Sequence, residues 1–324
     1  MNLANKLQTV IILTSVLLGI VLGQLSFAQA HADKLIMPFL MIMLYGLFLQ
    51  IQLRDIKNSF LNYKFTFTSV AINFIWTPVF AWLLGRILLN DVPELWLGFI
   101  MLMVTPCTDW YLVFTSLAKG NVPLGASILP LNFILQIVLL PFYLVYLGGA
   151  FVSIDVFNLL RGTLFVLAVP LILASISRKL SVSFFNKEWF DKNILSKTNA
   201  IQMIFLNLAI VAMFASQASI MIKNPALFLK LLPPVIIFFI VNFIVGQLTG
   251  RALKFQYRDI VALNLTTLAR NSPISLAIAV ASFPDKPLIS LALIIGPLIE
   301  LPVLALISQL LLMIHTSTPI NNKL

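Results

Sequence analysis

The feature that most constrains this chain is a succession of apolar runs, each long enough to cross a lipid bilayer. A helix rises about 1.5 Å per residue, so about 20 residues span ~30 Å of hydrocarbon. The 324 residues are 60% hydrophobic and only 10% charged, too few polar residues to cover a water-soluble fold. We therefore predict an all-α integral membrane protein with ten spans. They cover residues 7–26, 35–53, 65–89, 95–118, 123–147, 156–176, 198–221, 229–250, 260–282 and 287–314.

The first run has a competing interpretation. Lys6, the apolar residues after it and the small residues 28–30 (AQA) also fit a signal peptide with its cleavage site. The run is longer than a typical signal core, however, and its removal would leave nine spans and spoil the symmetry described below. We therefore count it as a membrane span.

The basic residues predict an orientation rather than a nucleic-acid partner. The net charge is +10, but Lys and Arg lie in short loops and form no continuous basic face. Most of them fall in alternate loops on one side of the membrane, which we expect to be cytoplasmic, with both termini inside. The opposite side has only Lys34, Arg86, Arg161, Lys223, Lys230 and Lys286. This pattern is typical of the cell membrane.

Two of the runs are interrupted in the middle by polar residues and proline. Residues 105–109 (TPCTD) divide the run over 95–118, and residues 269–273 (ARNSP) divide the run over 260–282. A backbone group freed inside hydrocarbon has no water to bond, so such breaks persist where they line a cavity. Broken helices of this kind form the binding sites of secondary transporters. We predict a solute site between the two breaks.

The two breaks also relate the two halves of the chain. The polar connection over 177–197 divides the spans into two sets of five, and an odd number requires inverted repeats. An offset of 164 residues lays Cys107 on Asn271 and Gln136 on Glu300. We expect one transporter domain over 1–324, with repeats over about 1–150 and 151–324 and with spans 4 and 9 broken and crossing.

In the first break, Cys107, Thr108 and Asp109 are the candidates for chemistry. A lone cysteine in an apolar helix is usually a small hydrophobe, but Cys107 follows proline among polar residues, and a thiol binds soft metalloids such as trivalent arsenic. A carboxylate in the middle of a membrane helix costs about 2.5–3.5 kcal/mol, so Asp109 needs a partner, water or a proton. We assign Cys107 and Thr108 to substrate binding and Asp109 to ion coupling.

In the second half, Arg270, Asn271 and Ser272 are candidates for substrate binding. Arg270 bears a charge within a span, for which the structural alternative is an ion pair with Asp109. Glu300 is a second buried carboxylate and, with its repeat mate Gln136, a candidate for ion coupling. One cysteine and two histidines near span ends predict neither a disulfide nor a metal site, and we expect no cofactor.

At these residues the chain resembles the bile acid:sodium symporter superfamily. Within it, residues 106–108 (PCT) and 117–121 (LAKGN) are similar to the fourth-span signature of the arsenical-resistance efflux family. Residues 276–280 (LAIAV) and 295–303 (IGPLIELPV) are similar to its last two spans. The resemblance implies ten spans in inverted five-span repeats and an arsenite-binding role for Cys107.

The chain departs from its relatives at two positions. The efflux family carries a glutamate, thought to exchange the proton, where this chain has Ser275. The sodium-coupled branch has a glutamate and a glutamine among its sodium ligands, where this chain has Thr266 and Arg270. We therefore expect proton coupling, if present, at Asp109 or Glu300, and we expect Arg270 to act as a built-in cation, to pair with Asp109 or to receive an anion.

These observations favour a secondary carrier for a small solute, either a metalloid oxyanion or an organic anion, coupled to protons or sodium. The main alternative to arsenite efflux is an organic-anion symporter in which Arg270 meets the anion. A membrane-embedded enzyme is disfavoured, because no group of nucleophile, base and metal ligands recurs across the spans. The sequence has no phosphate-binding P-loop pattern, so we expect an ion gradient to supply the energy.

Overall fold

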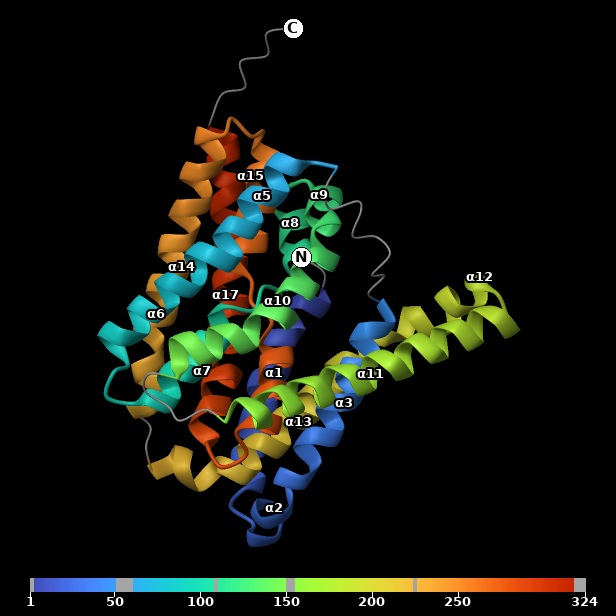
Figure 1. The fold of residues 1–324 in the computed structure, drawn as a ribbon, viewed down its shortest axis with the longest axis vertical. Helices are drawn as coiled ribbons and strands as arrows, with labels where there is room; N and C mark the ends of the chain where they lie inside the picture. Colours follow the sequence, from blue (N-terminus) through green and yellow to red (C-terminus); the bar gives the residue numbers. More distant parts are fainter. Residues whose placement is uncertain (1–2, 51–60, 108–109, 150–154, 224–225, 318–324) are drawn as a thin grey trace, which may run out of the picture.

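A computed structural model describes residues 3–50, 61–107, 110–149, 155–223 and 226–317 (Figure 1). The helices of the first half are α1 (Leu3–Leu22), α2 (Ser26–His31), α3 (Asp33–Gln50), α5 (Tyr63–Ala71), η2 (Ile72–Trp76), α6 (Thr77–Leu88), α7 (Pro93–Met103), α8 (Trp110–Leu117), α9 (Val122–Ser127), α10 (Leu129–Tyr143) and η3 (Leu144–Gly148). Those of the second half are α11 (Val156–Phe184), α12 (Lys187–Phe190), η4 (Asp191–Leu195), α13 (Ser196–Lys223), α14 (Ala226–Ala252), α15 (Tyr257–Leu268), α16 (Ser272–Ser282) and α17 (Pro287–Ser317).

The predicted all-helical architecture is confirmed, since no β-strand forms in the described part of the chain. Seven helical segments there are long and apolar enough to cross a membrane. Two shorter apolar helices, α7 and α16, are parts of the two interrupted runs. The arrangement of ten spans in two inverted repeats stays a prediction.

The helix formed by α5, η2 and α6 shows how the chain is adapted to lipid. Its outer face carries large apolar side chains spaced by four residues, and Ile75, Val79 and Ile87 are each more than half exposed. The opposite face buries polar residues, among them Asn73 and Thr77. This arrangement, with apolar residues outside and polar residues inside, is the reverse of that in a water-soluble helix. It is the arrangement expected in a bilayer.

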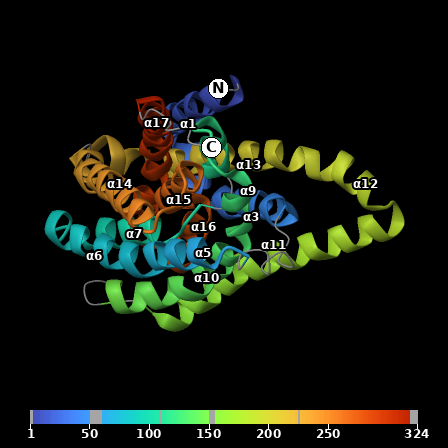
Figure 2. The same ribbon diagram turned by 90° about the horizontal axis from the view of Figure 1, so that it is seen from above.

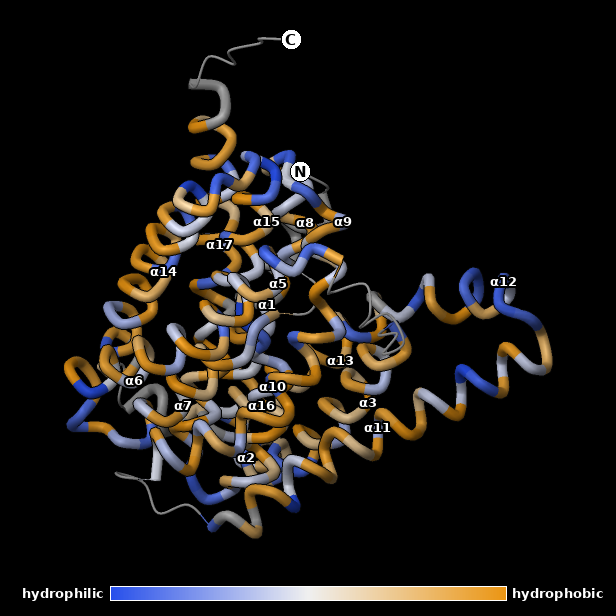
Figure 3. Tube along the Cα trace, turned by 45° about the horizontal axis from the view of Figure 1, so that its top comes forward, coloured by the Kyte–Doolittle hydropathy of each residue, from blue (hydrophilic) through white to orange (hydrophobic). Residues whose placement is uncertain are grey.

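The helices pack into two groups that follow the order of the chain only in part. α1, α3 and α11 pack around α13 or against one another, and α11 and α12 extend to one side in both views (Figures 1 and 2). The other group brings α7 against α17 and α14 against α15. Apolar residues dominate the length of the helices, whereas hydrophilic residues gather at their ends (Figure 3).

Glycines allow close helix contacts within this one chain. A Cβ at Gly19 would lie 2.6 Å from Cβ of Phe214, and one at Gly23 would lie 2.5 Å from the carbonyl oxygen of Ala215. Gly19 lies in α1 and Gly23 directly follows it, so both contacts bring this segment against α13. The pair of small residues four positions apart therefore packs helices inside the bundle, as membrane helices commonly do.

Contacts near the ends of the helices agree with the predicted alternation of sides. Lys230, near the start of α14, forms an ion pair with Asp91 in the loop between α6 and α7, and both were predicted to lie on the less basic side. Its hydrogen bond holds the pKa of the Asp91 carboxyl below the ordinary value. On the other side, the side-chain amide of Asn121 donates to Asp259 at 2.7 Å. Which side faces the cytoplasm stays a prediction.

Candidate functional site: the crossing of two interrupted helices

The two predicted breaks lie side by side near the centre of the bundle. They form a short antiparallel pair centred on Pro106 and Arg270. The second break is shorter than the sequence suggested, because α16 already begins at Ser272. The physical reason is that Pro273 occupies the first turn of α16, where its missing N–H would have no helical partner in any case.

Two backbone hydrogen bonds hold this pair together. The N–H of Cys107 donates to the carbonyl of Ala269 at 2.9 Å, and the N–H of Asn271 donates to the carbonyl of Thr105 at 2.7 Å. The 164-residue offset lays Cys107 on Asn271 and Thr105 on Ala269. It therefore relates each of these two hydrogen bonds to the other. Each break therefore satisfies part of the other's backbone inside the membrane, where no water is available to do so.

Hydroxyl groups satisfy carbonyls at the end of α7. A helix leaves its last four carbonyls without helical partners. The Thr105 hydroxyl lies 3.0 Å from the carbonyl of Met101 and 3.1 Å from that of Leu102. The Ser275 hydroxyl lies 3.0 Å from the same Met101 carbonyl and 2.8 Å from the Thr105 hydroxyl. Ser275, where the efflux family has a glutamate, is thus a buried structural link between the two breaks.

The guanidinium of Arg270 satisfies carbonyls at the ends of both α7 and α15. It donates from Nη1 to Met103 at 2.7 Å, from Nε to Leu268 at 3.1 Å, and from Nη2 to Thr267. Met103 is the last residue of α7, and Leu268 is the last residue of α15. The residue is only 3% exposed. A single charged side chain therefore joins the carbonyl ends of the two interrupted helices.

Two further groups surround the guanidinium. Asn73, in the π-helical turn η2, accepts a hydrogen bond from Nη2 of Arg270 at 3.2 Å and donates to the carbonyl of Thr266 at 3.3 Å. The Phe238 ring lies with its centroid 5.2 Å from Cζ of Arg270, a distance suited to a cation–π contact. Asn73 was not predicted as a site residue, although its polar neighbours Ser69 and Thr77 on the same helix face are the signal that points to it.

Glu300 and Gln136 differ in how they are bonded. Glu300 is 4% exposed, and its Oε1 accepts the backbone N–H of Arg270 at 2.8 Å. Gln136 is 1% exposed, and neither end of its amide has a hydrogen-bond partner among the described residues. The 164-residue offset lays Arg270 on Pro106, which has no N–H. The first half therefore has no backbone donor that would require a carboxylate at position 136.

The remaining predicted residues, four for substrate binding and Asp109 for ion coupling, fall into two sets. Cys107, Asn271 and Ser272 are buried at the crossing, and the Asn271 side chain caps α16 by accepting the N–H of Ile274. Thr108 and Asp109 lie outside the described residues. No three His, Cys, Asp or Glu side chains come together as a metal site in the part of the chain that the structure describes.

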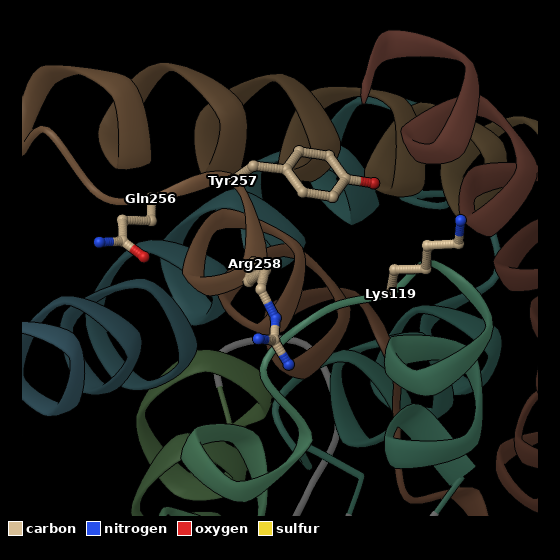
Figure 4. Close-up of a pocket in the computed structure, with 4 residues that line it drawn as sticks. All are labelled: Lys119, Gln256, Tyr257 and Arg258. Carbon is tan, nitrogen blue, oxygen red and sulfur yellow. The ribbon is translucent and has the colours of Figure 1, made fainter. Parts of the chain in front are cut away.

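A separate basic pocket of about 420 Å³ opens at the other end of α15 (Figure 4). It is lined by Lys119, Gln256, Tyr257 and Arg258. With about 1.5 Å per residue, the twelve residues of α15 place it about 18 Å from the break. The pocket is thus distinct from the crossing.

Comparison with known proteins identifies the family. Residues 37–224 match the model of the sodium bile acid symporter family. The match covers more than half of the chain. The chain belongs to this family. As a member of a family of secondary transporters, it is a multi-pass membrane carrier of a small solute, and it is not expected to be an enzyme.

Curated relatives match along most of their length. The arsenical-resistance protein Acr3 of Alkaliphilus metalliredigens is 23% identical over 322 residues, which cover 93% of this chain and 90% of the relative. Acr3 of Corynebacterium glutamicum is 22% identical over 275 residues, covering 82% and 74%. The uncharacterized protein YbaS of Bacillus subtilis is 24% identical over 303 residues, covering 92% and 94%.

The hydrogen bonds of the Thr105 hydroxyl predict that this group stabilises the protein. Thr105→Val keeps the shape of the side chain but removes the hydroxyl from a buried cluster of carbonyls, so it should lower the free energy of unfolding by about 1–3 kcal/mol. Thermal unfolding of the detergent-purified protein measures this loss. Thr68→Val is the matched control, since the Thr68 hydroxyl bonds its own helix at an exposed position. Equal stability of the Thr105 variant and the wild type would contradict the described crossing.

Proposed function

We propose that this member of the sodium bile acid symporter family is a gradient-driven carrier of a metalloid solute, arsenite, with its site at the crossing of the two interrupted helices. The observation that carries the proposal is the position of Cys107. The only thiol of the chain belongs to a residue whose backbone N–H makes one of the two hydrogen bonds that join the breaks. Relatives that cover most of the chain are named arsenical-resistance proteins, which supports the same substrate.

A single thiol suits transport better than a high-affinity metalloid site. Trivalent arsenic prefers sulfur ligands, and one sulfur binds it more weakly than three. A carrier must bind its solute firmly enough to select it and weakly enough to release it. The hydroxyl and amide groups near the crossing, including those of Asn271 and Ser272, supply hydrogen bonds to the hydroxyls of arsenite.

The bonding of Arg270 favours the metalloid over an organic anion. An anion receptor needs guanidinium donors that point at the ligand, in a bidentate pair where possible. Nε, Nη1 and Nη2 of Arg270 each already donate to a carbonyl of the chain. To bind a carboxylate, the side chain would have to leave buried carbonyls unsatisfied, which costs free energy.

Coupling is assigned to a carboxylate, either Glu300, which is buried, or Asp109, which lies outside the described residues. Desolvation disfavours the charged form of a carboxyl group, so a carboxylate in the membrane interior can take up and release protons near neutral pH. Glu300 contacts the backbone of Arg270, and a change in its protonation would alter a bond within the crossing. Protons are therefore the favoured coupling ion. Export is the direction that fits relatives named arsenical-resistance proteins.

Replacing Cys107 tests the substrate. Cys107→Ser keeps the size of the side chain and removes the soft ligand, so arsenite tolerance should collapse in a cell that lacks its own efflux systems. Ser116→Ala, at an exposed position of α8, is the control and should keep full tolerance. Both variants should reach the membrane in equal amounts. Full tolerance in the Cys107 variant would reject arsenite as the substrate and revive the organic-anion alternative.

Replacing Glu300 and Asp109 tests the coupling. Glu300→Gln replaces the carboxylate oxygen that accepts the Arg270 N–H with an amide oxygen, which can still accept this bond but cannot titrate. The protein should therefore fold, with proton-driven transport lost and arsenite exchange kept. Asp109→Asn makes the same test at the other carboxylate. Reconstituted vesicles with and without a proton gradient separate net transport from exchange. If both variants concentrate arsenite as the wild type does, neither carboxylate couples transport to protons.

A further inference from the structure

The environment of the Arg270 guanidinium is that of a cation-binding site. Its acceptors are the backbone carbonyls of Met103, Thr267 and Leu268 and the side-chain oxygen of Asn73. Neutral oxygens of this kind are the ligands that hard cations take in proteins. In broken-helix transporters, carbonyls from helix C-terminal ends and unwound backbone coordinate the coupling cation.

The positive charge of Arg270 also balances the partial negative charges at the C-terminal ends of α7 and α15. Each helix C-terminus carries about −0.5 elementary charge, so the ends of α7 and α15 together are balanced by about one positive charge. The Phe238 ring adds a negative π-face beside the same guanidinium. Since these groups are buried, no mobile ion from bulk water screens them.

We propose that Arg270 is a built-in cation: its guanidinium fills, between the carbonyl ends of α7 and α15, the place that a mobile cation would otherwise have to occupy. An arginine side chain keeps its proton under ordinary conditions, so this charge is permanent. The inference rests on the proposed function, because it concerns how the same carrier is coupled. Its consequence is that the crossing is complete without sodium, which leaves coupling to a titrating carboxylate.

The sequence suggests an ion pair with Asp109 as the structural alternative, and Asp109 lies outside the described residues. Glu300 is the described carboxylate that contacts Arg270, so the structural alternative to be tested is an ion pair of Arg270 with Glu300. The two interpretations predict different stabilities for the variant that lacks both charges. If the pair is what matters, removing both charges together should recover the stability that either single change loses. If the role of the guanidinium is to bond the carbonyls, removing the charge of Glu300 should not restore the stability of the Arg270 variant. The carbonyl ends of α7 and α15 would still lack a positive charge, and only a bound cation could stabilise them.

The stability of the purified full-length protein tests the inference without any substrate. The Tm of the wild type should be the same in sodium, potassium and choline chloride at equal ionic strength. Arg270→Gln should lower the Tm, and sodium should raise it again in a saturable way, whereas choline should not. Arg86→Gln is the matched control, because Arg86 is exposed and its guanidinium lies over the Trp82 ring, away from the carbonyl ends of α7 and α15. Its Tm should not respond to sodium.

Two further variants keep the test decisive if Arg270→Gln fails to fold. Arg270→Lys keeps the charge and should give an intermediate Tm with no sodium response. The double variant Arg270→Gln with Glu300→Gln should remain as unstable as the single Arg270 variant. Recovery of the double variant to wild-type stability would show that the ion pair is the role of Arg270 and would overturn the proposal.

Transport separates failure of this inference from failure of the proposed function. In reconstituted vesicles, replacing sodium by choline should leave the initial rate of arsenite transport by the wild type unchanged. A rate that rises and saturates with sodium, or a saturable sodium-dependent rise in wild-type Tm, would overturn the built-in cation and leave arsenite transport standing. Absence of arsenite transport with a sodium-independent Tm would reject the proposed function and leave the role of Arg270 standing.

Discussion

The structure depends on one constraint, which is that a backbone group without a partner inside the membrane is costly. Leaving one polar group unbonded in an apolar environment costs roughly 2–7 kcal/mol, and two interrupted helices expose several such groups at one depth. This chain meets the cost by crossing its two breaks. The backbones exchange two hydrogen bonds, Thr105 and Ser275 satisfy the end of α7, and Arg270 satisfies carbonyls of both helices.

The same constraint connects the fold to transport. Helix ends that must be satisfied concentrate hydroxyl, amide and charged groups at one place in an otherwise apolar protein. Cys107 lies among them, so its thiol is close to hydrogen-bonding groups in the interior of the protein. The exchange of two backbone bonds also makes the crossing a joint between the two halves of the chain.

The sequence predicted the places where residue type carries the signal. Proline and polar residues inside apolar runs identified both breaks, and the 164-residue offset paired them. The contributions of Met103, Thr267 and Leu268 could not be predicted in this way, because their carbonyls act and their side chains do not. Asn73 was missed because no cluster of polar residues interrupts its run, where only its position on a buried polar face distinguishes it.

The central claim, that arsenite binds at the crossing through Cys107, is tested most directly by X-ray absorption at the arsenic edge. The purified protein would be loaded with arsenite, and the ligands of the bound arsenic would be read from the spectrum. We expect the bound arsenic to have one sulfur neighbour and otherwise oxygen in the wild type, and oxygen alone in Cys107→Ser. Bound arsenic with only oxygen neighbours in the wild type would contradict it.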